Sequence, residues 1–250
     1  MTHLPKISVV TVVFNAENIV GKTIENVLSQ QYENLEYIII DGASTDSTLA
    51  IVKTFGDKIS KVLSQNDRGI YDAMNKGLAY STGEYVIFMN AGDFFYNNAV
   101  LRDMIATQPD ADVYYGNTKI INSKAEELGD RRHTPPKNLT WKSLQMGMCV
   151  SHQSILAKRS LVEAFDIRYK ISSDIDWTIR LLKKSTLIVN TGMYVSKFLE
   201  GGLSAQKQKQ GLKERFDIMQ NHYGLARTLL NHLFIAVKYL FQKLSRNSMT

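Results

Sequence analysis

The sequence predicts a doubly wound α/β domain, and three observations lead to that prediction. Short, β-branched apolar runs typical of buried parallel strands recur through the first half of the chain, beginning with Ile7 to Phe14. Helical patterns separate these runs. Polar residues follow directly where the strands should end. Such alternation builds a mostly parallel sheet with right-handed crossovers, whose ligands gather beyond the carboxyl ends of the strands.

The first half is expected to alternate strand and helix four times. The expected strands are 7–14, 35–40, 59–63 and 85–89, and the expected helices are about 19–28, 44–55 and 70–80. The second helix is expected to begin just after Ser44, because the stretch STDST is rich in the residues that favour a helix N-terminus.

The second half is less regular. Strands are expected at 113–121, 150–156 and 187–195, a proline-containing loop at 130–137, an amphipathic helix at 175–184 that opens at Ser172-Ser173-Asp174, a glycine-rich turn at 199–204, and two closing helices. The division that follows is a domain over 1–204, with halves 1–95 and 96–204, and a helical region over 205–250.

Length and composition exclude several classes of protein. With 250 residues, 44% of them hydrophobic, the chain can bury an ordinary core. One cysteine, Cys149, excludes an intramolecular disulfide framework and a cysteine-based zinc site. Nothing at the N-terminus resembles a signal peptide, and no uncharged apolar stretch is long enough to span a bilayer. We therefore expect a cytoplasmic protein.

The positive charge lies almost entirely in the tail. From Leu203 onward the chain has eight basic and two acidic residues, which accounts for the whole net charge of +6. The first 202 residues are neutral, so the chain is not a nucleic-acid binder with basic residues throughout. A basic tail on a neutral body indicates either an anionic surface as its partner or a solvated charged face.

Two carboxylates follow predicted strands. Asp93 ends an Asn-Ala-Gly-Asp turn, where it could hold Mg²⁺ or Mn²⁺ together with substrate phosphates, or could simply form the turn. Asp41 could accept N–H donors from a nucleobase or cap a turn. The dinucleotide fingerprint G-x-G-x-x-G and the P-loop are both absent, which argues against a nicotinamide oxidoreductase and a P-loop kinase.

Asp174 and Asp176 stand near the start of the helix predicted at 175–184. The helix dipole favours their ionised forms, and an ionised carboxylate can act as a general base or as an N-cap. Two positions apart on a helix, the two side chains point in different directions. His152, in a predicted strand, could be structural or catalytic.

Four stretches, taken in order, resemble the family 2 glycosyltransferases, which are inverting enzymes with a GT-A fold. The stretches are ISVVTVVFNAENIVGKTIENVLSQQYENLEYIIIDGASTDST, QNDRGIYDAMNKGLAYSTGEYVIFMNAGD, SHQSILAKR and YKISSDIDWTIRL. Each is weak alone, but as an ordered set from Ile7 to Leu181 they are specific. The chain looks most like bacterial members that build surface polysaccharides.

The resemblance implies a role for each matching residue. The base and ribose of a nucleoside diphosphate sugar would contact Thr11, Phe14, Asn15, Asp41 and Ser44, and the ribose, diphosphate or sugar would contact Asp67, Arg68 and Asn75. The D-x-D position would be Asn90, Ala91, Gly92 and Asp93, with Asp93 as the metal ligand. Asp174 would be the catalytic base, and His152 and Gln153 would lie near the acceptor and diphosphate.

Three departures from the family pattern matter. Gly92 stands where many members have an aspartate, which makes metal dependence less secure. Ser173 replaces the glutamate that precedes the base. The Q-x-x-R-W motif of processive synthases is missing, which favours transfer of a single sugar.

The resemblance therefore implies transfer of one sugar from a UDP- or GDP-type donor to a hydroxyl of a glycan or lipid-linked acceptor, with Mn²⁺ or Mg²⁺. The alternatives are a non-catalytic sugar-nucleotide or lipid-binding module, suggested by Gly92, and nucleotidyl transfer, which lacks its basic glycine-rich loop here. No nucleic-acid partner is expected.

The stretch from Leu225 to Ser245 predicts a basic amphipathic helix. Polar residues recur at helical spacing at Arg227, Asn231, Lys238, Gln242 and Ser245, and leucine, phenylalanine and valine cover much of the rest. Such a helix can lie in a membrane interface, here the inner face of the cytoplasmic membrane, or pack on the domain or on a second copy in a homodimer.

Overall fold

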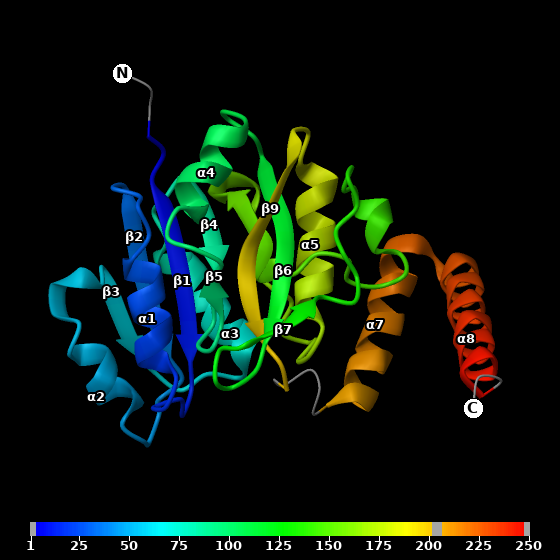
Figure 1. Ribbon diagram of the computed structural model, residues 1–250, viewed down its shortest axis with the longest axis horizontal. Coiled ribbons are helices and arrows are strands. Elements are labelled where there is room, and N and C mark those ends of the chain that lie inside the picture. Colours follow the sequence, from blue (N-terminus) through cyan, green and yellow to red (C-terminus); the bar gives the residue numbers. More distant parts are fainter. Residues whose placement is uncertain (1–3, 202–206, 248–250) are drawn as a thin grey trace.

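The computed structural model describes residues 4–201 and 207–247 and contains one mixed sheet in the order β3-β2-β1-β4-β8-β6-β9-β5, with β7 on β6 (Figure 1). Pairings among β1 to β4 are parallel, and those of β8 with β4 and β6 are antiparallel. The carboxyl ends of the first four strands therefore lie at one edge of the sheet.

The first half has the predicted alternation. Its elements are β1 (Ile7–Val13), α1 (Val20–Leu28), β2 (Leu35–Asp41), α2 (Thr48–Lys53), β3 (Lys61–Ser64), α3 (Ile70–Tyr80) and β4 (Tyr85–Phe88). The second half consists of β5 (Phe94–Phe95), α4 (Val100–Thr107), β6 (Val113–Ile121), β7 (Glu127–Asp130), β8 (Ile155–Lys158), α5 (Ser173–Lys184), β9 (Ile188–Leu199), α7 (Gln208–Tyr223) and α8 (Leu225–Asn247).

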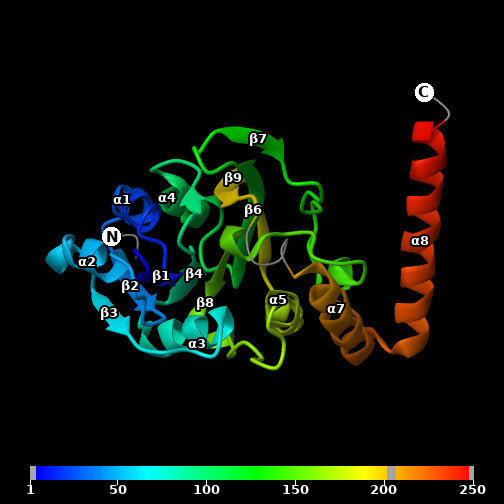
Figure 2. The ribbon, with the colours of Figure 1, turned by 90° about the horizontal axis from the view of Figure 1, so that it is seen from below.

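Alternating residues of the buried strands build two separate cores. Because successive strand side chains point to opposite faces, Val10 and Val12 of β1 join a core under α3 and α5, whereas Ile7 and Val9 join one under α1, α2 and α4. Seen along the sheet edge, the two sets of helices lie on opposite sides of the strands (Figure 2). Uninterrupted apolar strands were the right signal for a sheet covered on both faces.

Two predicted elements differ in the structure. The second helix begins at Thr48 rather than near Ser44, because Ser44 and Asp46 use their polar groups in turn hydrogen bonds: Ser44 with Asp41, and Asp46 Oδ1 accepting from the Thr48 N–H at 2.9 Å. The strand predicted at 150–156 begins only at Ile155, after a 3₁₀ turn over His152–Ser154. The predicted turn at 199–204 falls partly outside the described residues.

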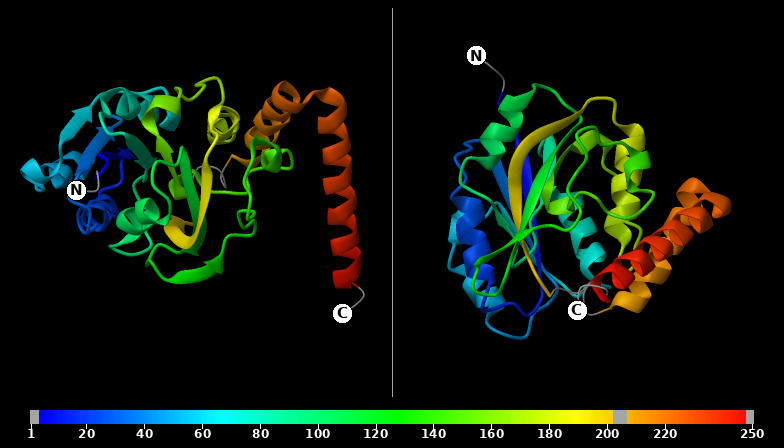
Figure 3. Two further views of the ribbon diagram at one scale, coloured as in Figure 1. Left: turned by 90° about the horizontal axis from the view of Figure 1, so that it is seen from above. Right: turned by 45° about the vertical axis from the view of Figure 1, so that its right-hand side comes forward.

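Helix α7 contributes to the core of the sheet domain, beyond the boundary predicted at 204. Its Ile218 and Met219 are buried in the core that α5 also contributes to. Helix α8 follows after Gly224 and stands out from the body beside α7 (Figure 3). Its first turns are held by Arg227 and Asn231, which donate to Gln145 at 2.7 and 3.0 Å.

Close packing of α3 on the sheet gives a stability prediction at a matched pair of helical glycines. A Cβ added at Gly77 would lie 2.3 Å from Val10 Cγ1, whereas one added at Gly21 would lie 3.6 Å from Ile51, an ordinary contact. Gly77→Ala should lower the free energy of unfolding by about 1–3 kcal/mol through overpacking. Gly21→Ala should leave it unchanged or raise it by up to about 1 kcal/mol, because alanine favours helix. Denaturant titration measures both, and equal stability of the two variants would contradict the packing.

Candidate active site

The turn after β4 places Asp93 at the bottom of a cavity. Asn90, Ala91 and Asp93 line this cavity of about 380 Å³ together with His152, Gln153 and Asp174. The Asp93 N–H donates to the Asn90 carbonyl at 2.9 Å, which closes the turn. Segments far apart in the sequence therefore meet here, as the family resemblance implied.

Gly92 adopts a conformation that explains why no second aspartate occupies this turn. Its φ angle of +98° lies in the left-handed region, and an added Cβ would lie 3.0 Å from Leu199 and 3.1 Å from Ile19. Its N–H donates to Thr23 Oγ1 at 2.9 Å. An aspartate here would be strained and crowded, so Asp93 is the carboxylate that this turn can present.

Asp93 is buried with its carboxylate held by two donors. Gln153 Nε2 donates to Oδ2 at 2.7 Å, and the Leu199 N–H donates to Oδ1 at 3.3 Å. Burial raises the pKa of Asp93 to about 6, although Gln153, His152 and the Leu199 N–H each act to lower it. At neutral pH the side chain is mostly ionised.

Asp174 lies at the start of α5 and faces the same cavity. Its Oδ1 accepts from the Ile175 N–H at 3.0 Å and lies 3.1 Å from the Tyr71 hydroxyl, while its Oδ2 lies 3.5 Å from His152 Nδ1. Burial would raise the pKa of Asp174, but His152, Tyr71 and Arg215 together hold it below its usual value. Asp174 is therefore ionised at neutral pH, as a general base must be.

His152 lies between Asn90 and Asp174. Asn90 Nδ2 lies 3.3 Å from its Nε2, and Asp174 Oδ2 lies 3.5 Å from its Nδ1. Asn90 Oδ1 is buried and without a hydrogen-bond partner among the described residues. The residue predicted in a strand stands instead on a 3₁₀ turn, where its ring lies beside Asp174.

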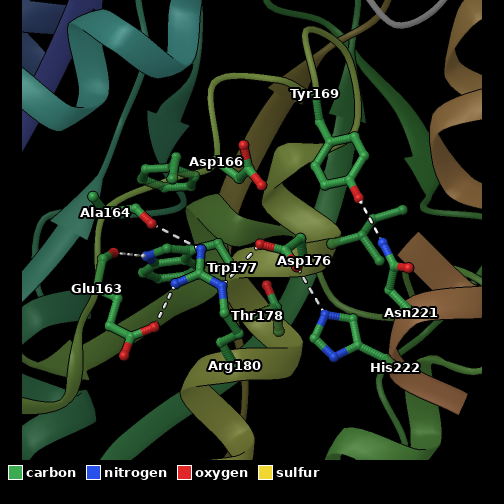
Figure 4. A network of polar contacts seen from close by, with 12 residues as sticks. Glu163, Ala164, Asp166, Tyr169, Asp176, Trp177, Thr178, Arg180, Asn221 and His222 are labelled. Atoms are coloured by element: carbon green, nitrogen blue, oxygen red, sulfur yellow. Dashed lines mark hydrogen bonds and ion pairs between the residues drawn. The ribbon is translucent and has the colours of Figure 1, made fainter. Parts of the chain in front are cut away.

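Asp176 points away from the cavity, as the helical spacing predicted. It accepts from Arg180 Nε and from His222 Nε2, both at 2.8 Å (Figure 4). Arg180 also pairs with Glu163 Oε2 at 2.7 Å. The second carboxylate thus joins α5 to α7 and to the 163–166 loop, and it is structural.

Glu214 is a buried carboxylate that the sequence reasoning missed. It accepts backbone N–H groups of Lys170, Ile171 and Ser172 at 3.0, 2.8 and 2.9 Å. Glu214 of α7 thus holds the segment that leads into Asp174. Its signal was present in the sequence, because Glu214 lies on the helical face of Gly211 and Ile218, where a carboxylate needs partners.

The residues expected to bind the nucleotide gather at the ends of β1 and β2. Asp41 Oδ1 accepts from the Ser44 hydroxyl at 2.5 Å and Oδ2 from Ser64 at 2.6 Å, so this carboxylate also builds its turn. Ser44 Oγ accepts from the Asn15 N–H at 2.8 Å. The ring of Phe14, 61% exposed, and the carboxylate of Asp67 both lie against Gly42.

Three residues expected to touch the donor have partners within the protein. Thr11 is fully buried and donates to the Met89 carbonyl at 2.7 Å, so it supports the sheet and has no surface for a nucleotide. Asn75 bonds both backbone groups of Phe165, at 2.9 and 2.7 Å, which fastens α3 to that loop. Arg68 is exposed and pairs with Asp72 at 3.1 Å.

The cavity offers a divalent cation only part of a coordination shell. Among the described residues no group of three His, Cys, Asp or Glu side chains could hold a metal ion. Asn90 and Asp93 both line the cavity, and the Asp93 carboxylate and the buried, unpartnered Asn90 Oδ1 are hard oxygen donors. Mg²⁺ and Mn²⁺ commonly take one or two such ligands and complete the shell with phosphates and water. These residues fit a cation that arrives with a diphosphate.

Comparison with known proteins identifies the family. Residues 8–165, more than half of the chain, match Glycosyl transferase family 2. The chain belongs to this family. It is an inverting glycosyltransferase, as the motifs predicted. The UDP-Glc:alpha-D-GlcNAc-diphosphoundecaprenol beta-1,3-glucosyltransferase WfgD of Escherichia coli is 25% identical over 241 residues, which cover 93% of this chain and 94% of that one.

Solved structures confirm the GT-A fold. TarS of S. aureus, residues 1–349, in complex with UDP-GlcNAc superposes with a TM-score of 0.71 at 19% identity, covering 86% of this chain and 64% of that one. The mannosyltransferase PcManGT of Pyrobaculum calidifontis, in complex with GDP-Man and Mn²⁺, has a TM-score of 0.66 at 15% identity, covering 100% and 82%. At these identities the likeness concerns the fold.

The raised pKa of Asp93 predicts how Asp93→Asn changes the pH dependence of stability. The folded protein binds the proton of the Asp93 carboxyl more tightly than the unfolded chain does. The stability that this proton contributes to the fold is therefore complete below about pH 4 and is lost as pH rises through about 6. The stability of the wild type relative to Asp93→Asn should therefore fall by about 2–3 kcal/mol between pH 4 and pH 8. Denaturant titrations across this range measure the difference, and parallel curves would contradict the assignment.

Proposed function

We propose that this glycosyltransferase moves one sugar from a nucleoside diphosphate sugar to a hydroxyl of a lipid-linked or glycan acceptor, with Asp174 as the general base. The observation that carries the proposal is the placement of an ionised Asp174 beside His152 in the cavity that also holds Asp93. The similarity to WfgD, whose name gives a diphosphoundecaprenol-linked sugar as its acceptor, supports a lipid-linked acceptor.

The proton goes to the less occupied oxygen of Asp174. Oδ1 already accepts from the Ile175 N–H and faces Tyr71, so Oδ2 takes the proton of the acceptor hydroxyl. The oxygen of the acceptor hydroxyl forms a bond to the anomeric carbon as the bond from that carbon to the diphosphate breaks, which inverts the configuration. The electron pair leaves with the diphosphate, through an oxocarbenium-like transition state.

The donor occupies the edge formed by the ends of β1 to β4 in this proposal. The exposed ring of Phe14 is available to the nucleobase of the donor, and Asp67 and Ser44 lie close to the 14–15 segment. Asp93 and Asn90 Oδ1 would hold Mg²⁺ or Mn²⁺, which when bound would neutralise charge on the departing diphosphate. Structures with UDP-GlcNAc and with GDP-Man leave both base types open.

The mutation that tests the function is Asp174→Asn. We expect it to lower the rate of sugar transfer by about 10²–10⁴-fold with donor affinity unchanged, because the amide keeps the shape and cannot accept the proton. Transfer is measured by product mass spectrometry with UDP- and GDP-sugars, Mn²⁺ and a synthetic lipid-diphosphate sugar, and donor affinity by calorimetry.

The control is Asp103→Asn, which removes an exposed carboxylate on α4 and should transfer at the wild-type rate. Full activity of Asp174→Asn would refute its role as base. Donor binding without transfer to any acceptor in the wild type would favour the alternative, a binding module.

Helix α8 is proposed to dock on an anionic membrane. Its described part exposes seven large apolar side chains, each 40–66% exposed: Leu225, Leu229, Leu230, Leu233, Phe234, Ile235 and Val237. No helix of the described part of the chain is long and apolar enough to cross a bilayer. An apolar face on a basic helix suits the interface, where each basic residue adds about 1 kcal/mol. A lipid-linked acceptor would make such docking useful.

Leu230→Glu with Leu233→Glu should abolish co-sedimentation with phosphatidylglycerol vesicles at low salt, because charge would enter the acyl boundary. The control is Leu128→Glu on β7, which is 53% exposed and lies away from α8. Wild-type binding should weaken at high salt. If the wild type stays in the supernatant with vesicles and analytical ultracentrifugation without vesicles shows a dimer, this face would be assigned to a second copy instead.

A further inference from the structure

Two arginines stand in the wall between the catalytic cavity and a second one, and the proposed mechanism uses neither of them as a ligand. The second cavity has a volume of about 610 Å³ and extends from β6 and β9 towards α7. Four residues border both cavities: Ile120, Arg131, Phe198 and Arg215. The two cavities therefore adjoin at a wall that combines two apolar side chains with two guanidinium groups.

Arg131 has an unpaired buried donor in this wall. It follows β7, and its Nη1 atom is buried without a hydrogen-bond partner among the described residues. Leaving a donor of a charged group buried and unpaired costs more free energy than leaving a neutral one. An anionic ligand would supply the missing acceptor.

Arg215 approaches the same wall from α7. It forms no hydrogen bond or ion pair with any other residue that the structure describes, and it lies near enough to Asp174 to lower the pKa of that carboxylate. Two guanidinium groups with free N–H donors suit the oxygens of a phosphate, which accept in fork geometry.

We infer that Arg131 and Arg215 form an anion subsite for a phosphate or diphosphate group of the acceptor. The acceptor sugar then lies at Asp174, the phosphate lies between the arginines, and the rest of the acceptor leaves through the second cavity along Ile120, Phe198 and Leu212. This inference rests on the proposed function, because it names the acceptor class of that site.

The positions of the lining residues favour the acceptor over the donor as the ligand of the arginines. The residues proposed for the nucleotide stand at the ends of β1 and β2, whereas Arg131 follows β7, which pairs with β6. The second cavity is lined by residues from 120 onward, with none from β1 to β4. An acceptor that extends from Asp174 into the second cavity would therefore leave the ends of β1 and β2 to the nucleotide.

The test is calorimetric binding of n-decyl diphosphate to the full chain in EDTA, below the micelle concentration. Arg131→Gln and Arg215→Gln should each weaken binding about tenfold or more, the loss of a charge-assisted hydrogen bond. Arg102→Gln on α4 is the charge-matched control, since Arg102 is an exposed basic residue that lines neither cavity; its affinity should equal that of the wild type. Equal losses in all three variants would overturn the subsite.

Two further measurements separate the sources of phosphate. Inorganic pyrophosphate should bind more weakly than the alkyl diphosphate, because it leaves the apolar wall uncovered; equal affinity would overturn the path through the second cavity. Affinity for the nucleotide sugar with Mn²⁺ should be unchanged in both arginine variants, and a matching loss there would assign the arginines to the donor.

Folding and function are controlled separately. Denaturant titration checks that Arg131→Gln is folded, and the exposed Arg215 carries the test if that variant fails to fold. The binding titration needs no turnover, so its result stands even if no sugar is transferred. Transfer with an unchanged acceptor KM in both variants would overturn the subsite while leaving the proposed function intact.

Discussion

The site depends on keeping two ionised carboxylates in one largely buried cavity. Burial opposes the charge on Asp93 and on Asp174, and only specific donors offset that cost. Asp174 has Tyr71, His152 and its own helix N-terminus, so its pKa is lowered. Asp93 has one side-chain donor, Gln153, and one backbone donor, so its pKa stays raised. The Asp174 carboxylate is therefore ionised and able to accept a proton. The charge of the Asp93 carboxylate would be balanced by a bound cation.

The same constraint explains why α7 is part of the enzyme. The segment 170–172 leads into Asp174, so its position determines where Asp174 points. The three backbone N–H groups of this segment donate to the Glu214 carboxylate. The Asp176 pairs with Arg180 and His222 fasten the other side of α5. A helix that looked like the start of a basic tail therefore helps to position Asp174. Helix α8, beyond Gly224, presents an apolar face to solvent in its described part.

The sequence predicted the parallel half of the sheet closely, because strands buried on both faces are uniformly apolar and leave little doubt about their ends. Asp93, His152 and Asp174 were singled out because they match family motifs, and the fold brings them to one cavity. The burial of Thr11 could not be predicted, since a polar residue in a buried strand gives no sign of whether it faces a ligand or a neighbouring tyrosine. Arg131 and Arg215 were missed because they come from a loop and a helix with no motif, and only the fold brings them together.

The distribution of charge around the cavity accords with a reaction that joins two anionic substrates. Asp93 and Asn90 offer oxygen ligands, so on that side an anion can bind only through a cation. Arg131 and Arg215 line the same cavity, and guanidinium groups bind phosphate oxygens directly. Under the proposed function, these two ways of binding phosphate would keep the donor diphosphate and the acceptor phosphate apart and would leave the acceptor sugar at Asp174.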